Sequence, residues 1–422
     1  MRYHPRILDL ELDELLPSVA AIAIDGPKGV GKTATASERA HGLLNLDSGT
    51  TRAVVRADPT TVLRAARPVL IDEWQRVPEV WDVIKRAVDD GAKPGSFLLA
   101  GSATPTRAVS LHSGAGRILS LRMRPMAMCE RAVLDPTVSF RDLLAGDGPD
   151  VGGESPLELP DYVDEIESSG FPGIRGLAPR ARRAQLDAYL DRSLGRDLSD
   201  HGAQVRRPQS LRAWVTAYAA ATATTASYNA IARAATPGEG DSPSSMTAQR
   251  YREWLTELWL IDPIPAWLPP ARSLGKLAHA PKHHLADPAL AVRLLRVTSR
   301  DLAEGRGSTL ASEGTPLLGT LFESLAALTV RTCAQAAEAT VTHLRTERGE
   351  HEIDFVVEAH DGGILAFEAK LSTAIDDHDV RHLRWLRENN PRVRDTIVLN
   401  TGRYAYRRPD GVAVIPLALL GP

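Results

Sequence analysis

Gly26-Pro27-Lys28-Gly29-Val30-Gly31-Lys32-Thr33 follows an apolar run, Val19–Ile24, and opens a helix-compatible run that continues to His41. A glycine-rich loop between a strand and a helix is typical of the P-loop, which holds the phosphates of a nucleotide. Glycines let backbone N–H groups face an anion without a Cβ clash, and the helix N-terminus favours the same negative charge. The alternative is an ordinary glycine-rich turn before a helix.

The P-loop pattern assigns roles to the polar residues of this stretch. Lys32 is expected to reach the β- and γ-phosphates, and the Thr33 hydroxyl is expected to bind Mg²⁺. The predicted nucleotide-binding residues are Gly26, Pro27, Lys28, Gly29, Val30, Gly31, Lys32, Thr33 and Ala34.

The composition predicts a cytoplasmic protein of several domains. A chain of 422 residues is long enough for about two to four domains with cores of their own. The net charge of −3 gives no global attraction to nucleic acid, so any such site must be local. Cys129 and Cys333 are the only cysteines, which suits a reducing cytosol. The N-terminus lacks a signal-like segment and no apolar run is long enough to cross a membrane, so we expect no membrane contact.

Two further apolar runs end in polar residues that suit a nucleotide site. The run Pro68–Ile71 ends in Asp72 and Glu73, as a buried parallel strand does when it reaches the ligand-binding edge of its sheet. Asp72 is expected to hold Mg²⁺ through water, and Glu73 to orient or deprotonate the attacking water. The next apolar run leads to Ser102, which we choose over Thr104 as a sensor of the γ-phosphate. The alternative for Ser102 is an ordinary helix cap.

Strands alternate with helical stretches through the first third of the chain, which predicts a doubly wound α/β sheet. The predicted strands lie near 19–25, 43–47, 68–72, 96–101 and 117–122. The order of P-loop, Asp-Glu strand end and polar strand end resembles the AAA+ ATPases over about residues 1–135. The resemblance implies ATP as the nucleotide, a homo-oligomer, and an arginine supplied by a neighbouring subunit. Arg117 is the first candidate for this arginine and Arg107 the second; the alternative is that they are surface residues.

A closer resemblance extends over nearly the whole chain. The motifs that carry it are Leu70-Ile71-Asp72-Glu73-Trp74-Gln75, Gly101-Ser102, Gly116-Arg117, Arg124-Pro125-Met126, Gly170-Phe171-Pro172-Gly173 and Glu368-Ala369-Lys370. They are similar to a bacterial and archaeal family of predicted ATPases, in which an AAA-type domain is followed by a domain of unknown function. The resemblance implies the architecture and leaves the biological role open.

Four domains are predicted from these patterns. They are a P-loop AAA+ ATPase domain (1–143), a linker and helical lid (144–207), a winged-helix-like domain (208–300) and a C-terminal α/β domain (301–422). Glycine and proline residues at 144–160 predict the linker. Helical segments at 161–168 and 179–200 predict the lid.

The third predicted domain has the order of a winged helix-turn-helix. Helices are expected at 209–224, 227–232 and 245–259, followed by a wing within 261–287. Thr247, Gln249 and Arg250 then lie where a recognition helix contacts DNA. The alternative is a packing module without DNA contact.

The C-terminal region contains a predicted β-hairpin with polar residues on one face. Ile353–Glu358 and Ile364–Lys370 alternate in polarity and are joined by an Asp-Gly-Gly turn. Closing the hairpin brings Asp354, Glu368 and Lys370 together. This arrangement resembles the core of the PD-(D/E)xK nucleases, although the proline that precedes the first acid in that family is absent here.

This resemblance implies a second active site. Two carboxylates can hold Mg²⁺ or Mn²⁺, which polarises a phosphodiester, while a lysine positions water or stabilises developing charge. Asp354, Glu368 and Lys370 are the candidate catalytic residues, and Glu323, from an upstream helix, is a further candidate metal ligand. The alternative is an inactive nuclease fold that serves as a scaffold.

Two hypotheses of function follow. In the first, an ATP-driven oligomer cleaves DNA or RNA with its C-terminal domain. In the second, ATP controls a switch or scaffold whose C-terminal domain is catalytically silent. A third hypothesis, transcriptional regulation through the winged helix, has less support.

Overall fold

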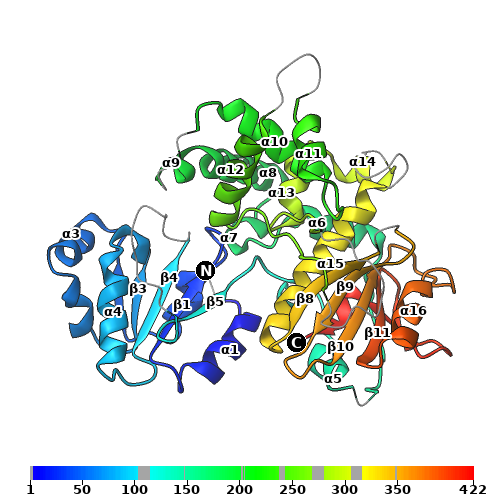
Figure 1. The fold of residues 1–422 in the computed structure, drawn as a ribbon, viewed down its shortest axis with the longest axis horizontal. Helices are drawn as coiled ribbons and strands as arrows, with labels where there is room; N and C mark the ends of the chain where they lie inside the picture. Colours follow the sequence, from blue (N-terminus) through cyan, green and yellow to red (C-terminus); the bar gives the residue numbers. More distant parts are fainter. Residues whose placement is uncertain are drawn as a thin grey trace.

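The fold is mixed α/β, as the sequence predicts. The computed structural model describes residues 3–102, 115–146, 148–200, 203, 205–236, 243–268, 280–305, 316–346 and 349–422. Figure 1 shows a first sheet with its helices in blue and cyan, a group of helices in green, and a second sheet among yellow, orange and red elements.

The first sheet consists of five parallel strands in the order β2-β3-β4-β1-β5. They are β1 (Ala21–Asp25), β2 (Gly42–Asn45), β3 (Val69–Asp72), β4 (Phe97–Gly101) and β5 (Leu119–Arg122). Alternate residues of β1, β3 and β4 belong to two different hydrophobic clusters, so both faces of the sheet are buried. The five strands lie at the predicted positions, and this prediction is confirmed.

The strand order places the predicted site loops side by side. β4 pairs with both β1 and β3, so the segments after these three strands meet at the carboxyl edge of the sheet. The helices of this region are α1 (Ile7–Leu15), α2 (Lys32–Ser37), α3 (Gly49–Ala57) and α4 (Glu79–Asp89), with the 3₁₀ turns η1 (Pro59–Arg64), η2 (Trp74–Arg76) and η3 (Met128–Glu130). α2 ends at Ser37 and does not reach His41, because the N–H groups of His41 and Gly42 both donate to the carbonyl of Pro68 as β2 begins.

The middle of the chain is helical. Its elements are α6 (Leu159–Ser168), α7 (Pro172–Arg175), α8 (Pro179–Arg192), the π-helical turn η4 (Ser193–Asp197), α9 (Leu198–Asp200), α10 (Pro208–Ala220), α11 (Tyr228–Ala234), α12 (Ser245–Glu257), α13 (Pro288–Leu295) and α14 (Ser299–Ala303). The helices predicted for the lid and for the winged helix are therefore present, within a few residues at their ends.

The described part of the segment predicted as a wing forms bridges within itself and with the C-terminal sheet. Ile261 and Ile264 form bridges with Leu285 and Lys282, and Ala266 forms a parallel bridge with His343 of β8 (Thr340–Arg345). The N–H of Trp267 also donates to the carbonyl of His343. The two antiparallel bridges are compatible with a hairpin, so the wing stays a prediction, and the bonds to His343 attach the segment to the C-terminal sheet.

The second sheet has seven strands in the order β7-β12-β13-β11-β10-β9-β8. Besides β8 they are β7 (Gly153–Glu154), β9 (Glu352–Glu358), β10 (Ile364–Ala369), β11 (Val393–Asn400), β12 (Tyr404–Arg407) and β13 (Ala413–Pro416). β9 and β10 form the predicted antiparallel hairpin, whereas β10, β11 and β13 are parallel. α15 (Leu317–Ala336) and α16 (Arg381–Asn389) pack against this sheet, and the 3₁₀ turn η5 (Leu417–Leu419) follows β13.

The stretch expected to be a linker contributes to the second sheet instead. β7 pairs with β12 at the edge of the sheet, and the preceding β6 (Val138–Ser139) pairs with β14 (Leu420–Gly421). Between them, α5 (Phe140–Ala145) places Phe140 in a stacked contact with Phe367, at 5.8 Å between ring centroids. β7, within the predicted linker, therefore joins the C-terminal sheet, whereas β6 and β14 form a separate two-stranded sheet.

One helix, α15, is long and apolar enough to cross a membrane by length and composition alone. Its apolar window is 78% buried within the protein. It contacts α1, α6, α13 and β8, and Figure 1 shows it between the two sheets. These contacts identify it as a core helix that joins the parts of the molecule.

Candidate nucleotide site and C-terminal acidic cluster

The P-loop follows β1 and adopts a backbone that needs glycine. Gly26 has φ of 150° and Gly31 has φ of 108°. A Cβ at Gly26 would lie 2.1 Å from the carbonyl oxygen of Met123, so a side chain there is excluded by backbone. This close contact fixes the start of the loop against Met123, the residue that follows β5.

Lys32 is the first residue of α2 and is 6% exposed. Its Nζ donates to the carbonyl oxygens of Gly26 and Pro27, both at 2.8 Å. Burial lowers the pKa of Lys32 to about 8, although the charges of Glu73, Asp25 and Asp72 oppose the shift. A buried ammonium that contacts neutral carbonyls would gain charge-assisted hydrogen bonds from phosphate oxygens.

Thr33 and Asp72 lie together beside Lys32. The Thr33 hydroxyl donates to Asp72 Oδ1 at 2.7 Å. Burial raises the pKa of Asp72, and the neighbouring charge of Glu73 adds to the effect. A hydroxyl and a carboxylate of raised pKa form an oxygen-rich set that fits Mg²⁺, whose charge would stabilise the ionised acid.

Glu73 follows β3 in a left-handed conformation, with φ of 53°. Gln75 Nε2 donates to Glu73 Oε2 at 2.6 Å, and the Ser102 hydroxyl donates to the same oxygen at 3.2 Å. Gln75 and Ser102 also contact each other, at 3.3 Å between Nε2 and Oγ. Ser102, which follows β4, therefore holds the carboxylate of Glu73, which follows β3. The strand order permits this contact, and the motif alone did not identify it.

A buried ion pair supports the P-loop from the N-terminal segment. Arg6 Nη2 lies 3.0 Å from Glu130 Oε2, and both residues are less than a tenth exposed. Arg6 Nη1 donates to the carbonyl of Val30 at 2.8 Å. Sequence reasoning missed this pair, since no motif links two residues separated by 124 positions.

Two residues of the helical region reach the P-loop. Lys28 Nζ lies 3.3 Å from Asp197 Oδ1, at the end of η4. Phe171, which precedes α7, lies near Gly29, where an added Cβ would be 4.0 Å from the ring. These contacts place part of the predicted lid next to the predicted phosphate-binding loop.

Arg117 is at the opposite edge of the sheet. It precedes β5, whose first residue pairs with Ile22, so it lies near the amino ends of the strands. Its side chain is about half exposed and pairs with Asp89 at 2.8 Å. Arg117 therefore cannot act on the nucleotide of its own chain. Arg107 and Thr104 lie outside the described residues.

The C-terminal hairpin brings the predicted acidic residues together. The register pairs Phe367 with Phe355, so Glu368 lies across from Asp354. Lys370 Nζ donates to Glu368 Oε2 at 3.0 Å, and the N–H of Ala369 donates to Asp354 Oδ2 at 2.9 Å. Glu323 approaches from α15, as expected.

Lys282, which sequence reasoning missed, lies within this cluster. Its Nζ is 2.8 Å from Asp354 Oδ1, 2.9 Å from Glu323 Oε1 and 3.5 Å from Glu352 Oε1. Its side chain is 1% exposed. We define these four residues with Glu368 and Lys370 as the acidic cluster.

The electrostatics of the acidic cluster follow from this packing. Burial alone would raise the pKa of Asp354, but the charges of Lys282 and Lys370 lower it. Burial raises the pKa of Glu368 and Glu323, and the charge of Asp354 adds to both shifts. Burial alone would lower the pKa of Lys282, but its carboxylate neighbours raise it well above the usual value. The carboxylates therefore favour the charged form of Lys282.

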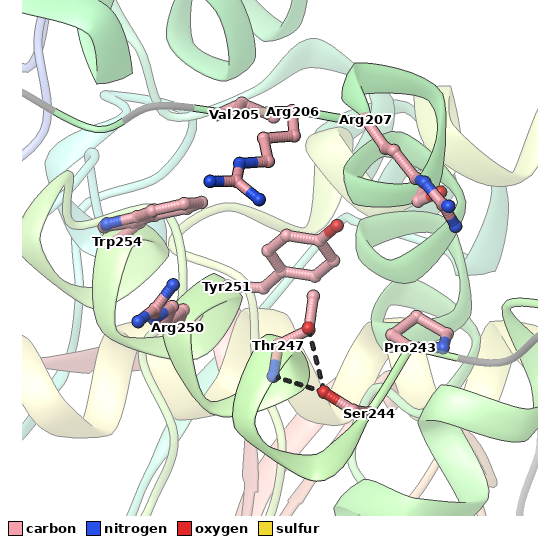
Figure 2. Close-up of a pocket in the computed structure, with 10 residues that line it drawn as sticks. Val205, Arg206, Arg207, Pro243, Ser244, Thr247, Arg250, Tyr251 and Trp254 are labelled. Carbon is pink, nitrogen blue, oxygen red and sulfur yellow. Dashed lines mark hydrogen bonds between the residues drawn. The ribbon is translucent and has the colours of Figure 1, made fainter.

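The predicted recognition helix borders an arginine-lined pocket of about 440 Å³. Figure 2 shows Arg206, from the segment before α10, projecting toward Tyr251 and Trp254 of α12, with Arg250 beside Trp254. Arg207 and Thr247 also line it, whereas Gln249 bonds Glu253 on the same helix. Within the described ranges, no carboxylate forms an ion pair with Arg206, Arg207 or Arg250.

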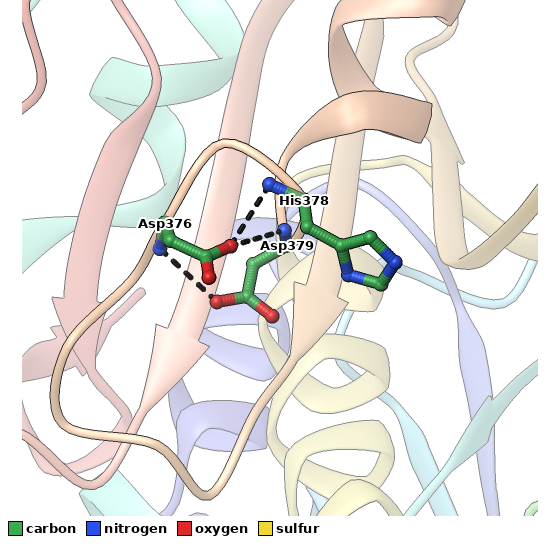
Figure 3. A group of neighbouring side chains, drawn as sticks. All are labelled: Asp376, His378 and Asp379. Atoms are coloured by element: carbon green, nitrogen blue, oxygen red, sulfur yellow. Dashed lines mark hydrogen bonds between the residues drawn. The ribbon is translucent and has the colours of Figure 1, made fainter.

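A further group of polar side chains precedes α16. Figure 3 shows Asp376, His378 and Asp379 on one exposed turn. Asp376 Oδ1 accepts hydrogen bonds from the backbone N–H of His378 and of Asp379, at 2.8 and 3.1 Å. These bonds stabilise the turn that precedes the start of α16 at Arg381.

Comparisons with known proteins agree with the nucleotide site. Residues 18–132 match the family model described as AAA domain. Residues 159–301 and 318–420 match two models described as domains of unknown function, DUF8612 and DUF4143. The match and the P-loop geometry define the N-terminal region as an AAA-type ATPase domain.

Uncharacterized proteins of Mycobacterium bovis (Mb2031c) and Mycobacterium tuberculosis (Rv2008c) are each 26% identical to this chain over 316 residues. The matched region covers 74% of this chain and 61% of each relative. Among solved structures, the Walker-type ATPase PABY2304 of Pyrococcus abyssi is 14% identical, with a TM-score of 0.40, covering 70% of this chain and 96% of that one. A RuvB mutant of Thermotoga maritima is 16% identical, with a TM-score of 0.22, covering 61% of this chain and 87% of that one.

Proposed function

We propose that the chain is a Mg²⁺-dependent ATPase that works as an ATP-controlled switch. One observation carries the ATPase proposal. The Thr33 hydroxyl, the Asp72 carboxylate and the Glu73 carboxylate meet at the carboxyl edge of the first sheet, beside the buried amine of Lys32. Phosphoryl transfer depends mainly on positioning and on stabilising charge, and these four groups supply both.

Each residue has a distinct role in this proposal. Thr33 and Asp72 hold Mg²⁺, which neutralises charge on the β- and γ-phosphates when bound. Lys32 exchanges the carbonyls of Gly26 and Pro27 for phosphate oxygens. Glu73 orients the attacking water and accepts its proton, while Gln75 and Ser102 keep its carboxylate in place.

The Glu73→Gln variant tests the hydrolysis step. The amide keeps the shape but cannot accept the proton, so ATP binding should persist while turnover falls about 100-fold. Calorimetry measures binding and phosphate release measures turnover. Glu79→Gln, which changes an exposed acid of α4, is the matched control and should leave turnover unchanged. Near-normal turnover of Glu73→Gln would contradict the role of Glu73.

The C-terminal domain is the part of the molecule that ATP binding is proposed to control. The convergence of Asp354, Glu368, Lys370 and Glu323 favours a metal-dependent nuclease. Lys282 opposes it, because its ammonium lies against two of the carboxylates that would bind the metal. We therefore favour a catalytically silent domain over DNA or RNA cleavage. Metal-dependent cleavage by wild type that is lost in Lys370→Ala would reverse this preference.

A chain of buried contacts supports communication between the two sites. Arg122 and Arg124 flank Met123, the residue against Gly26, and both pair with Asp262 at 2.8 and 2.9 Å. Arg331 of α15 pairs with the same carboxylate at 2.7 Å. Asp262 is two residues from Ile264, the backbone partner of Lys282. The P-loop and the acidic cluster are thus linked through one buried carboxylate.

Nucleic-acid binding by α12 is a second candidate function. Three arginines around an aromatic-lined pocket, none of which pairs with a carboxylate of the described residues, favour it, since guanidinium and aromatic groups suit phosphates and bases. Arg206→Ala with Arg250→Ala should weaken binding of labelled single-stranded DNA or RNA and lower the salt slope by about one to two. Arg233→Ala removes an exposed arginine of α11 as the control. Equal affinities in all three proteins would contradict this candidate.

Arg117 is proposed to act between subunits of an oligomer. Its place near the amino edge of the sheet is consistent with an action on a neighbour's nucleotide only. Mixing Arg117→Ala subunits with Glu73→Gln subunits should restore part of the ATPase activity, because one interface in the mixture is then complete. A mixture no more active than its components would contradict the proposal.

A further inference from the structure

Lys282 is held in place by backbone as well as by charge. Lys282 and Ile264 exchange both backbone hydrogen bonds, each at 2.9 Å. The neighbouring His283 and His284 are buried and bond Ala226 and Ser324, from other elements. The lysine therefore enters the acidic cluster from a segment that is anchored on both sides.

Asp354 and Glu368 contact different lysines, and Glu323 shares Lys282 with Asp354. Asp354 Oδ1 accepts from Lys282, and Glu368 Oε2 accepts from Lys370. The other oxygen of Asp354 accepts the N–H of Ala369. Glu368 Oε1 is buried and accepts no hydrogen bond from any described residue.

A divalent cation does not fit this arrangement. Mg²⁺ and Mn²⁺ bind carboxylate oxygens at about 2.0–2.2 Å and need several of them at once. Lys282 Nζ lies within 2.9 Å of both Asp354 and Glu323, so the cation would have to share this volume with an ammonium of the same sign. The lysine supplies charge and hydrogen bonds to the same oxygens that the metal would use.

We propose that Lys282 is an internal cation that replaces a divalent metal in the acidic cluster, and that removing its ammonium creates a site for Mg²⁺ or Mn²⁺. The ligands of that site would be Asp354, Glu323 and Glu368. This inference extends the proposed switch, because it gives the silent C-terminal domain a physical cause. It requires no ATP hydrolysis and can be tested without nucleotide.

The test is Mn²⁺ binding by the full-length chain, measured by calorimetry without ATP. Wild type should show no saturable uptake up to about 1 mM. Lys282→Ala should bind Mn²⁺ at least about 30-fold more tightly than wild type, because its carboxylates have lost their counter-ion. Adding Asp354→Asn to Lys282→Ala should abolish the uptake. Lys93→Ala, which removes an exposed lysine, is the control for charge and should behave as wild type.

A second variant covers the case in which Lys282→Ala folds poorly. Lys282→Met keeps the length of the stem and removes only the ammonium. Mn²⁺ should raise the thermal midpoint of Lys282→Met and leave that of wild type unchanged.

Two outcomes overturn the proposal: uptake by wild type that Asp354→Asn abolishes, or no uptake by either folded Lys282 variant. Titration of the same samples with Mg²⁺ and ATP reports the P-loop separately. Failure of the ATPase proposal is therefore distinguishable from failure of the proposal for Lys282.

Discussion

Lys32 and Lys282 are both buried lysines, but their amines face opposite kinds of partner. Lys32 contacts two neutral backbone carbonyls, and burial lowers its pKa to about 8. Lys282 contacts three carboxylates, which raise its pKa. Lys32 is therefore suited to bind an anion, whereas Lys282 already serves as the cation of its site.

The largest expected effect is on stability at the acidic cluster. Lys282→Ala leaves Asp354, Glu323 and Glu352 without their shared cation, so the free energy of unfolding should fall by about 3–5 kcal/mol at neutral pH. Chemical denaturation monitored by circular dichroism measures the loss. Lys93→Ala should change stability by less than about 0.5 kcal/mol. A loss no larger than that of the control would mean that Lys282 is not a paired structural cation.

The second effect concerns ligand binding at the P-loop. Lys32→Ala should weaken ATP binding about 100-fold, since a buried charge-assisted contact to phosphate is lost. Its free energy of unfolding should stay within about 1 kcal/mol of wild type, because no carboxylate in hydrogen-bond contact loses its partner. Calorimetric titration and denaturation separate the two quantities. A large loss of stability with unchanged affinity would reverse the contrast between the lysines.

The third effect is the pH dependence of ATP binding by Lys32. Since the folded pKa of Lys32 is about 8, its ammonium loses its proton above that pH, and ATP affinity should fall by up to about tenfold per pH unit. The unfolded chain holds this proton more tightly, so the Lys32 contribution to stability rises with pH between about 8 and 10.5. Titrations of ATP at pH 7, 8 and 9 check the affinity. A flat profile, equal to that of Lys32→Ala, would contradict the assignment.

The smallest expected effect concerns the support of Glu73. Gln75→Ala removes the 2.6 Å hydrogen bond to Glu73 Oε2 but leaves the Ser102 contact. Turnover should fall about tenfold or less while the Michaelis constant for ATP changes little, because only the orientation of the base is affected. Gln75→Glu should be worse than Gln75→Ala, since it adds a like charge. Steady-state phosphate release distinguishes these outcomes.

Local patterns predicted most of the first sheet and the C-terminal hairpin. The P-loop, Asp72 and Glu73 each follow an apolar strand, and parallel strands must bring their carboxyl ends together. Asp354 and Glu368 are opposite each other because a hairpin turn fixes their register. These relations depend on spacing within a short stretch of chain, so the sequence contains them.

Contacts between distant segments could not be predicted in this way. Lys282 is 41 residues from Glu323 and 72 from Asp354, and no motif surrounds it. The pairing of β7 with β12 likewise joins a glycine-rich stretch to a strand far along the chain. Such contacts depend on how whole elements pack, and packing leaves no periodic signal in either partner.

The most direct test counts the metal sites of wild type by electron paramagnetic resonance of free Mn²⁺, with the same Mn²⁺ and ATP without protein as the reference. We expect uptake of one Mn²⁺ per chain when ATP is present and none without ATP, because Thr33 and Asp72 hold the metal beside the phosphates that Lys32 contacts, while Lys282 excludes it from the acidic cluster. No uptake with ATP, or ATP-independent uptake that Asp354→Asn removes, would contradict this expectation.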